Sequence, residues 1–461
     1  MRGKYYEFED LKREIIDPGL CTHCGLCIEA CPVDVIGTSA PDEGSLPELI
    51  GECPACDICV EICPGKTVDF PALREAHMEA ESDFSDYLGT YRKIYLGHAL
   101  DPDVRASGSS GGVITALLLH ARETDKVDGA LVLAEEEDRP YQFRSKIVET
   151  DEEIRKAAQS KYVIPGHMGA ADVTDYRKRL AYVGLPCQIH GIKKLENIRP
   201  NWTRQFEYTI GLYCGDTLYF SATAALFKRF GIKDYSQIES VHYREGEWPG
   251  SFEVRLKDGR DFSISKYTFN YLSFLYDVDR CHVCTDITAE FADISVGDGW
   301  KYEGTQPDGG WSIIVTRNQK GEELVQSAIE NGDLFVEEVD IHDAVKMHAH
   351  SLDNKKIGSM LRIENRQKSG KPVPDYGLPT PNVGIKRRLG ERAVALVIAT
   401  IRSLPMRTLL NHLPLPWLEA FTYRLREIWK WWSKSNLKTE VHTDATDLLQ
   451  IGTAVPKETV S

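Results

Sequence analysis

Long apolar runs are missing from this sequence of 461 residues. A membrane-spanning helix needs about 18 to 20 largely apolar residues, whereas the longest candidate, Ala393 to Ile401, has nine and is followed by Arg402. The first ten residues are acidic and have no apolar centre, so they do not resemble a signal peptide. We therefore expect a soluble globular protein with neither a transmembrane span nor a leader.

Surplus positive charge is missing as well. The chain has 55 Lys and Arg against 70 Asp and Glu, a net charge of -15. Binding to nucleic acid needs many cations against the phosphates, so nucleic acid is excluded as the main partner. The hydrophobic share of 42% and the charged share of 27% are those of a globular protein and exclude a disordered or collagen-like chain. The length predicts two to four domains.

Cysteine is the residue type that the chain has in quantity. It has 12, and eight of them form two runs of the pattern C-x2-C-x2-C-x3-C-P, 32 residues apart. This pattern is typical of two-cluster ferredoxins, in which three cysteines wrap one 4Fe-4S cubane and the fourth ligates the other. A pair of zinc sites is the alternative, but zinc motifs usually separate two cysteine pairs by a longer loop. The pattern predicts two clusters, one held by Cys21, Cys24, Cys27 and Cys63, the other by Cys53, Cys56, Cys59 and Cys31.

Four cysteines lie outside these runs, and their number is that of one more cubane. Cys187 and Cys214 each follow a short apolar run that predicts a strand, whereas Cys281 and Cys284 form a C-x2-C pair. Neighbouring strands would place the first two side by side. The spacing leaves two interpretations open: a third cluster, or two buried inert thiols with half a zinc knuckle.

A turn rich in glycine and serine, residues 107–113, comes directly before a predicted helix, ITALLLHARE. Small residues at a helix N-terminus let a phosphate reach free backbone N–H groups. A flexible connector is the alternative interpretation. We favour an anion cradle, whose residues would be Ser109, Ser110, Gly111 and Gly112.

Six motifs in series resemble the coenzyme F420 hydrogenase/dehydrogenase beta-subunit family. They are SGSSGGVITALLLHA, AAQSKYV, YVGLPCQIHGIKKL, IGLYCGDTL, VHYREGEWPGSF and CHVCTDITAEFADISVGDGW, and the match covers about residues 92 to 366. The resemblance implies bound FAD, a 4Fe-4S cluster beside it and hydride exchange with F420. It also favours the third cluster, because all four remaining cysteines fall in these motifs.

The resemblance further implies roles for individual side chains. Ser160 and Lys161 would lie near the FAD pyrophosphate or the flavin ring, although a solvated surface lysine is the alternative. Arg244 and Trp248 would shape the deazaflavin pocket, or simply form the turn of a hairpin. Asp298 would lie beside the third cluster and the cofactor, or be purely structural.

The fused ferredoxin segment narrows the resemblance to members that oxidise reduced F420 and pass electrons onward. F420H2 gives a hydride, a cubane accepts one electron, and FAD accepts both kinds of transfer. We expect the input subunit of a membrane-associated F420H2:quinone or phenazine oxidoreductase, with electron-accepting partner subunits. The F420-dependent sulfite reductase is disfavoured because no sirohaem half follows. An electron-transfer module, or an F420-dependent reductase with a different acceptor such as ferredoxin, would also fit the sequence. NADH is not expected as a donor, because the chain has no complete G-x-G-x-x-G with an acidic partner.

We predict an α+β fold: an N-terminal two-cluster ferredoxin segment, an FAD-binding dehydrogenase domain and a C-terminal helical extension. Residues 70–92 are polar and acidic, which suggests a connector. The pattern also predicts late strands in DISVGDGW and WSIIVTR, and a helix in KGEELVQSAIENGDL that ends at Gly332. The predicted segments are 1–80 ferredoxin, 92–366 dehydrogenase, 367–382 linker, 383–438 helical extension and 439–461 flexible tail.

The helical extension has a composition of its own. It carries 11 Lys or Arg and three Glu, a net charge of 11 - 3 = +8, and four of the eight tryptophans: Trp417, Trp429, Trp431 and Trp432. Cationic helices with exposed Trp bind membrane interfaces. Packing on a protein partner or on the chain's own body is the alternative. We expect peripheral binding to the cytoplasmic membrane face, and catalysis that does not need the extension.

Overall fold

The computed structural model describes residues 5–38, 46–79, 82–164, 177–300 and 310–433. The predicted flexible tail, 439–461, lies outside these residues, and so does the end of the predicted helical extension, 434–438. The described chain contains both helices and strands, in agreement with the α+β class.

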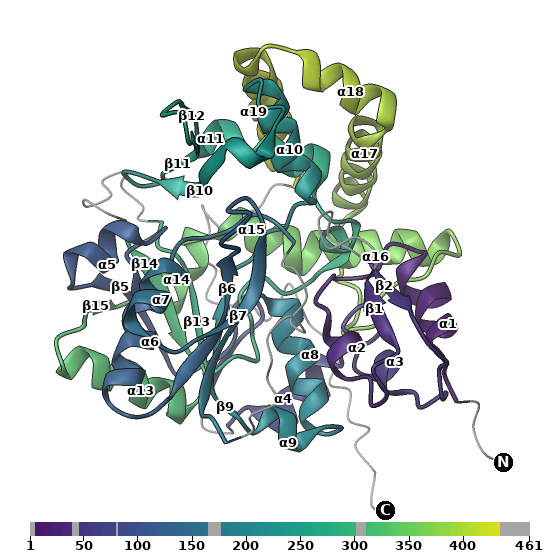
Figure 1. Ribbon diagram of the computed structural model, residues 1–461. Helices are drawn as coiled ribbons and strands as arrows, with labels where there is room; N and C mark the ends of the chain where they lie inside the picture. The colour runs from purple at the N-terminus through teal and green to yellow at the C-terminus, as the bar shows by residue number, and fades with distance from the viewer. Residues whose placement is uncertain (1–4, 39–45, 80–81, 165–176, 301–309, 434–461) are drawn as a thin grey trace, which may run out of the picture.

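An eight-stranded mixed sheet forms the centre of the molecule, in the order β15-β5-β14-β13-β9-β8-β6-β7 (Figure 1). The four strands β13, β9, β8 and β6 run parallel, and antiparallel strands complete both edges. The strand bounds are β5 Lys93–Ala99, β6 Gly129–Glu135, β7 Phe143–Val148, β8 Leu180–Gly184, β9 Phe206–Leu212, β13 Ile294–Asp298, β14 Ser312–Thr316 and β15 Leu334–Glu338. The two predicted late strands are β13 and β14.

Helices cover both faces of this sheet. Alternation along β8 shows the two layers: Ala181 belongs to one core, whereas Leu180 and Tyr182 belong to the other, as the two-residue period of a strand requires. The first face packs against α5 Pro102–Ser107, α6 Val113–Glu123, α7 Asp151–Lys156 and α13 Gln319–Glu330. The second packs against α8 Pro186–Glu196, α9 Pro200–Thr203, α14 Ile341–Met347 and α15 Ala349–Asp353. The helix predicted to end at Gly332 is α13, and Gly332 has the positive φ of such a terminus.

The N-terminal segment packs directly on α8 (Figure 1, purple). A Cβ on Gly191 of α8 would lie 2.0 Å from Cδ1 of Leu26, so glycine permits this close approach. The segment's elements are α1 Phe8–Leu11, the π-helix η1 Lys12–Ile16, α2 Leu26–Glu29, β1 Ile36–Thr38, β2 Pro47–Leu49, α3 Ile58–Glu61 and α4 Phe70–His77. Its apolar residues and those of α8 form one hydrophobic core.

The expectation of a connector over residues 70–92 is wrong. This stretch contains α4, β3 Asp83–Ser85 and β4 Gly89–Tyr91, and Phe70 is fully buried in the shared core. The polar composition reflects the outer faces of these short elements, while Phe70, Leu73 and Leu88 supply the buried ones.

A smaller three-stranded sheet forms a second layer with the C-terminal helices (Figure 1, teal and yellow). Its elements are β10 Ile238–Glu245, β11 Ser251–Leu256, β12 Asp261–Ser265, α10 Phe220–Arg229, η4 Tyr235–Gln237, α11 Lys266–Phe269, α12 Leu272–Tyr276 and η5 Asp279–Val283. The extension is α17 Ile385–Arg402, α18 Leu404–His412 and α19 Leu415–Ser433. Ile401, Leu410 and Leu418 of the extension share the core of this layer.

The π-helix η6 Asn354–Gly358 and α16 Ser359–Lys368 link the dehydrogenase body to the predicted linker, so α16 crosses the expected boundary at residue 366. The linker itself is attached to the body. Tyr376 is buried, its hydroxyl donates to the carbonyl of Val283 over 2.9 Å, and Asp375 forms a bridge with Thr67.

Candidate active site

A cavity of about 550 Å³ lies at the carboxyl ends of the parallel strands. Leu133, Gly184, Leu212 and Asp298, at or near the ends of β6, β8, β9 and β13, all line it. Ligands of α/β sheets bind at this edge, because loops leave the strands there and helices begin there. The topology therefore makes this cavity the candidate active site.

The glycine- and serine-rich turn forms one wall of the cavity. Gly111 and Gly112 have φ values of +84° and +72°, and a Cβ on Gly112 would lie 2.4 Å from the carbonyl oxygen of Val104. The backbone of Ser160 donates to Oγ of Ser109 over 2.8 Å, which joins the turn to the QSKY motif. Ser109, Ser110, Gly112 and Ser160 line the cavity, with Gly111 shaping the turn behind them. Since α6 begins here, the turn fits a bound phosphate.

Lys161 also lies in the cavity wall and is therefore no solvated surface lysine. Its Nζ donates to the carbonyls of Ala157 and Ala158 over 2.5 and 2.6 Å. Burial lowers the pKa of Lys161 to about 8, although Glu135 works in the opposite direction. The ammonium group therefore loses its proton at a lower pH than an ordinary lysine, and an anion in the cavity would stabilise its charged form.

Arg244 and Asp298 form an ion pair in the cavity wall. Arg244 is only 3% exposed, and its Nη1 lies 3.1 Å from a carboxylate oxygen of Asp298. Its Nη2 donates to the carbonyl of Ser109 over 2.8 Å, so it also fixes the glycine- and serine-rich turn. Burial is the largest influence on Arg244 and opposes its charge, but Asp298 and the hydroxyl of Tyr162 together outweigh it and raise the pKa of the guanidinium. Arg244 therefore connects the turn, β10 and β13.

Trp248 lies on the β10–β11 hairpin, in keeping with the hairpin interpretation of its motif. Its ring centroid lies 4.6 Å from that of Trp300, with which it packs edge to face. The described residues that line the cavity include its neighbour Pro249 and Trp300 but not Trp248 itself. The structure thus brings Arg244 to the cavity and leaves Trp248 behind this wall.

Two cavity residues were missed by the sequence analysis. Tyr213 is edge-on to His348, with 5.2 Å between ring centroids, and its hydroxyl has no hydrogen-bond partner among the described residues. Nε2 of His348 lies 2.9 Å from the carbonyl oxygen of Asp298, and burial lowers the pKa of the imidazole. Tyr213 directly precedes Cys214 in the motif IGLYCGDTL, which could have marked it as a cavity residue. No sequence signal marks His348.

The four dispersed cysteines come together beside the cavity. As predicted, Cys187 and Cys214 follow neighbouring parallel strands, β8 and β9, and Cys214 lines the cavity. Burial and then Cys284 raise the pKa of Cys187 well above its ordinary value, and burial with Cys281 does so for Cys214. All four thiols are free of disulfides. Four mutually close thiols are the donor set of a cubane.

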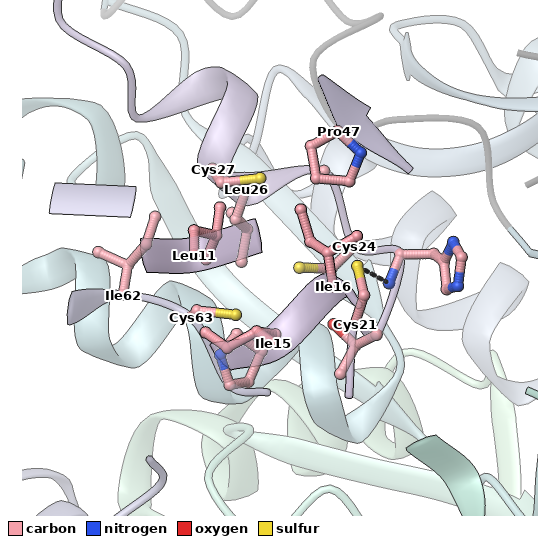
Figure 2. A pocket seen from close by; sticks show the side chains of 14 residues that line it. Leu11, Ile15, Ile16, Cys21, Cys24, Leu26, Cys27, Pro47, Ile62 and Cys63 are labelled. Carbon is pink, nitrogen blue, oxygen red and sulfur yellow. Dashed lines mark hydrogen bonds between the residues drawn. The ribbon is translucent and has the colours of Figure 1, made fainter. Parts of the chain in front are cut away.

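The structure brings four of the ferredoxin cysteines together in the combination that their spacing predicts. Figure 2 shows a small cavity lined by Cys21, Cys24, Cys27 and Cys63, so the fourth cysteine of the second run joins the first three of the other. Burial, then Cys53 and Cys56, raises the pKa of Cys59 to about 12, with smaller contributions from Cys63 and then Cys31. Among the described residues, no three His, Cys, Asp or Glu side chains are placed to hold one metal ion. A cubane instead spreads its ligand sulfurs over separate irons.

The three cysteine sets form a series that leads away from the cavity. Cys24 of the first ferredoxin set is close enough to Cys187 to raise the pKa of the Cys187 thiol, as the third largest influence after burial and Cys284. Both cysteines also lie near Tyr182 and raise the pKa of its hydroxyl. The buried Arg280 donates to the carbonyls of Val283 and Pro64. It therefore bridges the third set and the ferredoxin segment.

Comparison with known proteins agrees with this arrangement. Residues 94–171 match the N-terminal part, and residues 177–342 the C-terminal part, of the coenzyme F420 hydrogenase/dehydrogenase beta subunit. Residues 13–64 match a 4Fe-4S dicluster domain. This chain belongs to the coenzyme F420 hydrogenase/dehydrogenase beta-subunit family. It is an F420-related oxidoreductase subunit with an iron-sulfur domain fused to it.

Similar proteins differ in their wider context. The coenzyme F420-dependent sulfite reductase of Methanocaldococcus jannaschii is 28% identical over 85% of this chain, which spans 57% of that protein's length. A subunit of the F420H2 dehydrogenase of Methanosarcina mazei is 25% identical over 67% of this chain and 82% of its own length. A chain in the F420-reducing NiFe hydrogenase complex of Methanosarcina barkeri shares the fold: the TM-score is 0.50, with 22% identity, over 64% of this chain and 99% of the other.

The F420 beta-subunit match ends at residue 342, but the cavity does not. Ile398 of α17 and Arg426 and Trp429 of α19 line it too. The sequence alone predicts catalysis that does not need the extension. The structure changes that expectation, because removing the extension would also remove part of the cavity wall.

Proposed function

We propose that this protein oxidises F420H2 by hydride transfer to FAD in the cavity and passes single electrons through its 4Fe-4S clusters to a partner. The partner would belong to a membrane-associated F420H2:quinone or phenazine oxidoreductase. One observation carries the proposal: Cys214 of the third set lies in the cavity wall, while Cys187 of the same set lies next to Cys24 of the ferredoxin segment. A two-electron donor in the cavity would thus be one cysteine set away from the ferredoxin clusters.

The chain's own residues would bind and orient the two flavin-like rings. Ser109, Ser110 and Gly112 would hold the FAD pyrophosphate at the start of α6, and the ammonium of Lys161 would neutralise part of its charge. FAD supplies the conversion between hydride transfer and single-electron transfer. Arg244 would position the phosphate turn through the carbonyl of Ser109 rather than touch the reacting atoms.

The cysteine series favours a defined electron order. It runs from the third set, at the cavity, to Cys21, Cys24, Cys27 and Cys63, and then to Cys53, Cys56, Cys59 and Cys31. Cys59 of the last set is near enough to raise the pKa of Cys27. Its influence is smaller than that of burial and of Cys24, Cys21 and Cys63, which belong to the same set as Cys27. The set that lies farthest along this series is the exit toward a partner.

The extension supports peripheral binding to anionic lipid. Leu396, Trp417 and Trp431 are 70%, 71% and 68% exposed, and the segment has a net charge of +8 within a chain of -15. Cations and exposed Trp together favour an anionic interface. Among the described residues no single helix is long and apolar enough to cross a membrane, although α17 and α18 pass that test together with a 72° bend. Cubanes persist in reducing compartments, which favours the cytoplasmic membrane face.

Anaerobic titration of the purified holoprotein tests the catalytic proposal. F420H2 should bleach the flavin absorbance and then reduce the clusters, and released flavin should be FAD rather than FMN. Reduction by NADH that is faster than reduction by F420H2 would contradict the donor assignment.

Vesicle binding tests the membrane proposal separately. The variants Leu396→Asp and Trp417→Asp change exposed side chains outside the set that lines the cavity. They should weaken binding to phosphatidylglycerol vesicles and leave F420H2-dependent dye reduction unchanged. Full-length protein that ignores such vesicles but binds a purified partner subunit would favour protein docking instead.

A second candidate is an F420-dependent reductase with another acceptor. It is favoured by the alignment with the F420-dependent sulfite reductase, which covers 85% of this chain. The acceptor separates the two: quinone or phenazine reduction supports the first candidate, and reduction of ferredoxin or a sirohaem partner supports the second.

A further inference from the structure

Helix α19 places two side chains in the cavity that lie outside the F420 beta-subunit match. Arg426 and Trp429 are three residues apart and therefore share one face of the helix. The ring of Trp429 packs edge-on against His350, which also lines the cavity, with 5.5 Å between the centroids. The extension is thus part of the cavity as well as of the outer surface.

Specific polar contacts hold the extension in this position. Arg402 at the end of α17 donates to the carbonyl of Asp277 over 2.6 Å and lies 2.6 Å from Nε2 of His282. Both partners line the cavity. Glu419 of α19 accepts from the hydroxyl of Thr268 over 2.9 Å.

A buried ion-pair group anchors the start of α17 as well. Glu391 is fully buried and pairs with Arg362 of α16, while Arg387 lies 2.8 Å from Asp353. Buried charges hold their partners in defined geometry, because separating them leaves an uncompensated charge. The position of α19 over the cavity is therefore set by the fold.

Arg426 differs from the other cations of the cavity. Arg244 is paired with Asp298, Lys355 donates to the carbonyl of Cys281, and Lys161 donates to two carbonyls. Arg426 is exposed, and none of the hydrogen bonds or ion pairs found among the described residues includes it. Its charge acts on its neighbour Glu427 at longer range, and Glu427 itself pairs with Lys430. An exposed guanidinium group with no hydrogen-bonded carboxylate among the described residues, beside an indole and at the edge of a cavity, is suited to an anionic ligand group.

We infer that Arg426 and Trp429 form a subsite for the anionic side chain of the hydride donor. This inference rests on the proposed function. F420 is a deazaflavin whose side chain carries phosphate and carboxylate groups. Arg426 would pair with one of these groups, and the indole of Trp429 would pack against the chain that carries it. The reacting ring would lie deeper, toward Tyr213 and the third cysteine set. The subsite would position the donor and take no part in the chemical step.

The helix offers a matched control for each residue. Arg424 and Trp431 lie on the same helix, are exposed, and do not belong to the set that lines the cavity. The test compares Arg426→Gln with Arg424→Gln and Trp429→Leu with Trp431→Leu in the full-length holoprotein. Flavin content and iron content show that each variant is loaded and folded.

Steady-state kinetics with a dye acceptor and equilibrium binding of oxidised F420 give the two measurements. Arg426→Gln should raise KM for F420H2 and Kd for F420 about three- to tenfold, the range expected for one charged contact at a partly exposed site. The value of kcat should stay within about twofold, because the subsite does not act on the transition state selectively. Arg424→Gln should match the wild type. The deazaflavin that lacks the anionic side chain should bind wild type and Arg426→Gln equally.

Three outcomes would overturn the inference. One is that Arg426→Gln and Arg424→Gln have the same KM and Kd. Another is that Arg426→Gln weakens binding of the shortened deazaflavin as much as that of F420. The third is that Trp429→Leu behaves like Trp431→Leu. Wild-type holoprotein that does not oxidise F420H2 would instead refute the proposed function, and the inference with it.

Discussion

The eight ferredoxin cysteines and the four dispersed ones form similar sites in opposite ways. In the ferredoxin segment, short-range spacing sets the grouping, and the chain brings together residues that are at most 42 positions apart, such as Cys21 and Cys63. Cys187, Cys214 and Cys284 meet only because β8 and β9 are neighbours and η5 returns to their ends. A local motif is visible in sequence, whereas a topological one appears only when the sheet order is known.

In each region a lysine donates to the backbone carbonyl of a predicted ligand: the half-buried Lys194 of α8 reaches the ferredoxin segment, and the buried Lys355 reaches the third set. Lys194 lies 3.3 Å from the carbonyl oxygen of Cys63, and Lys355 lies 3.0 Å from that of Cys281. The two regions therefore share an electrostatic feature as well as a donor set, which makes them suitable for paired mutations.

The largest expected effect comes from removing one ligand in each region. Cys187→Ser should lower iron content from about 12 to about 8 atoms per chain, since each cubane holds four. It should also block electron transfer from the flavin to the ferredoxin clusters while F420H2 still bleaches the flavin. Cys56→Ser should remove the outermost cluster and leave transfer to the third set intact. Iron and sulfide analysis with stopped-flow absorbance checks both, and an iron content near eight in the wild type would contradict a third cluster.

The second largest effect should come from a substitution that overpacks the core beside the third cysteine set and leaves the ferredoxin segment unchanged. A Cβ on Gly211 would lie 2.3 Å from Cβ of Ala289 and 3.0 Å from that of Ala292, beside the third set. Gly211→Val should therefore destabilise the fold by about 1–3 kcal/mol, the usual cost of overpacking, and loosen the third set before the ferredoxin clusters. Gly384→Val, with nothing within 4 Å of its Cβ, is the control. Denaturant unfolding and iron content give the comparison, and equal stability of the two variants would contradict the packing argument.

The two lysines that donate to Cys63 and Cys281 allow a smaller and more selective test. Lys355→Met removes a cation near the thiolates of the third set and should lower the reduction potential of that cluster by about 60 mV, equivalent to tenfold in a one-electron equilibrium. Lys194→Met should lower the potential of the cluster at Cys63 instead. Redox titration followed by electron paramagnetic resonance measures each cluster separately. Equal shifts of both clusters in one variant would show that the charge does not act locally.

The smallest expected effect is a pH dependence at Lys161. Burial places its pKa at about 8, below its ordinary value of 10.5. The cation available to a phosphate is therefore lost as pH rises through about 8, and FAD should bind more weakly at pH 9 than at pH 7. Without FAD, protonation of this buried group costs stability, so the apoprotein should gain stability between pH 8 and 10.5, where the unfolded chain still holds the proton.

Lys161→Met is the control for this prediction. Its affinity for FAD should be lower at pH 7 and nearly independent of pH across the same range. Equilibrium dialysis of FAD measures both proteins. A wild-type affinity that does not change between pH 7 and 9 would show that Lys161 does not act on the cofactor.

Much of the fold was predictable where the signal is local. The helix at 319–330, the strands at 294–298 and 312–316 and the pairing of Cys63 with the first cysteine run follow from short patterns. The burial of Phe70 was not predictable, because a single apolar residue within a polar stretch gives no periodic pattern that would mark it as part of the core. His348 and Arg426 were missed for a different reason. His348 lies in the turn between α14 and α15, and Arg426 lies on α19; both follow the main sheet in the chain, and only tertiary packing determines where these elements meet the cavity.

Gly191 has a consequence for whether the ferredoxin segment can be removed or exchanged. Its missing side chain lets Leu26 pack against α8, and the ferredoxin segment and the dehydrogenase body share one hydrophobic core as a result. The ferredoxin segment is thus not an independently folding domain, because its core continues into the dehydrogenase body. Cutting the chain before residue 82 would uncover Phe291 and Tyr376 together with the face of α8. Exchange of this segment between relatives would have to carry the matching surface of α8 with it.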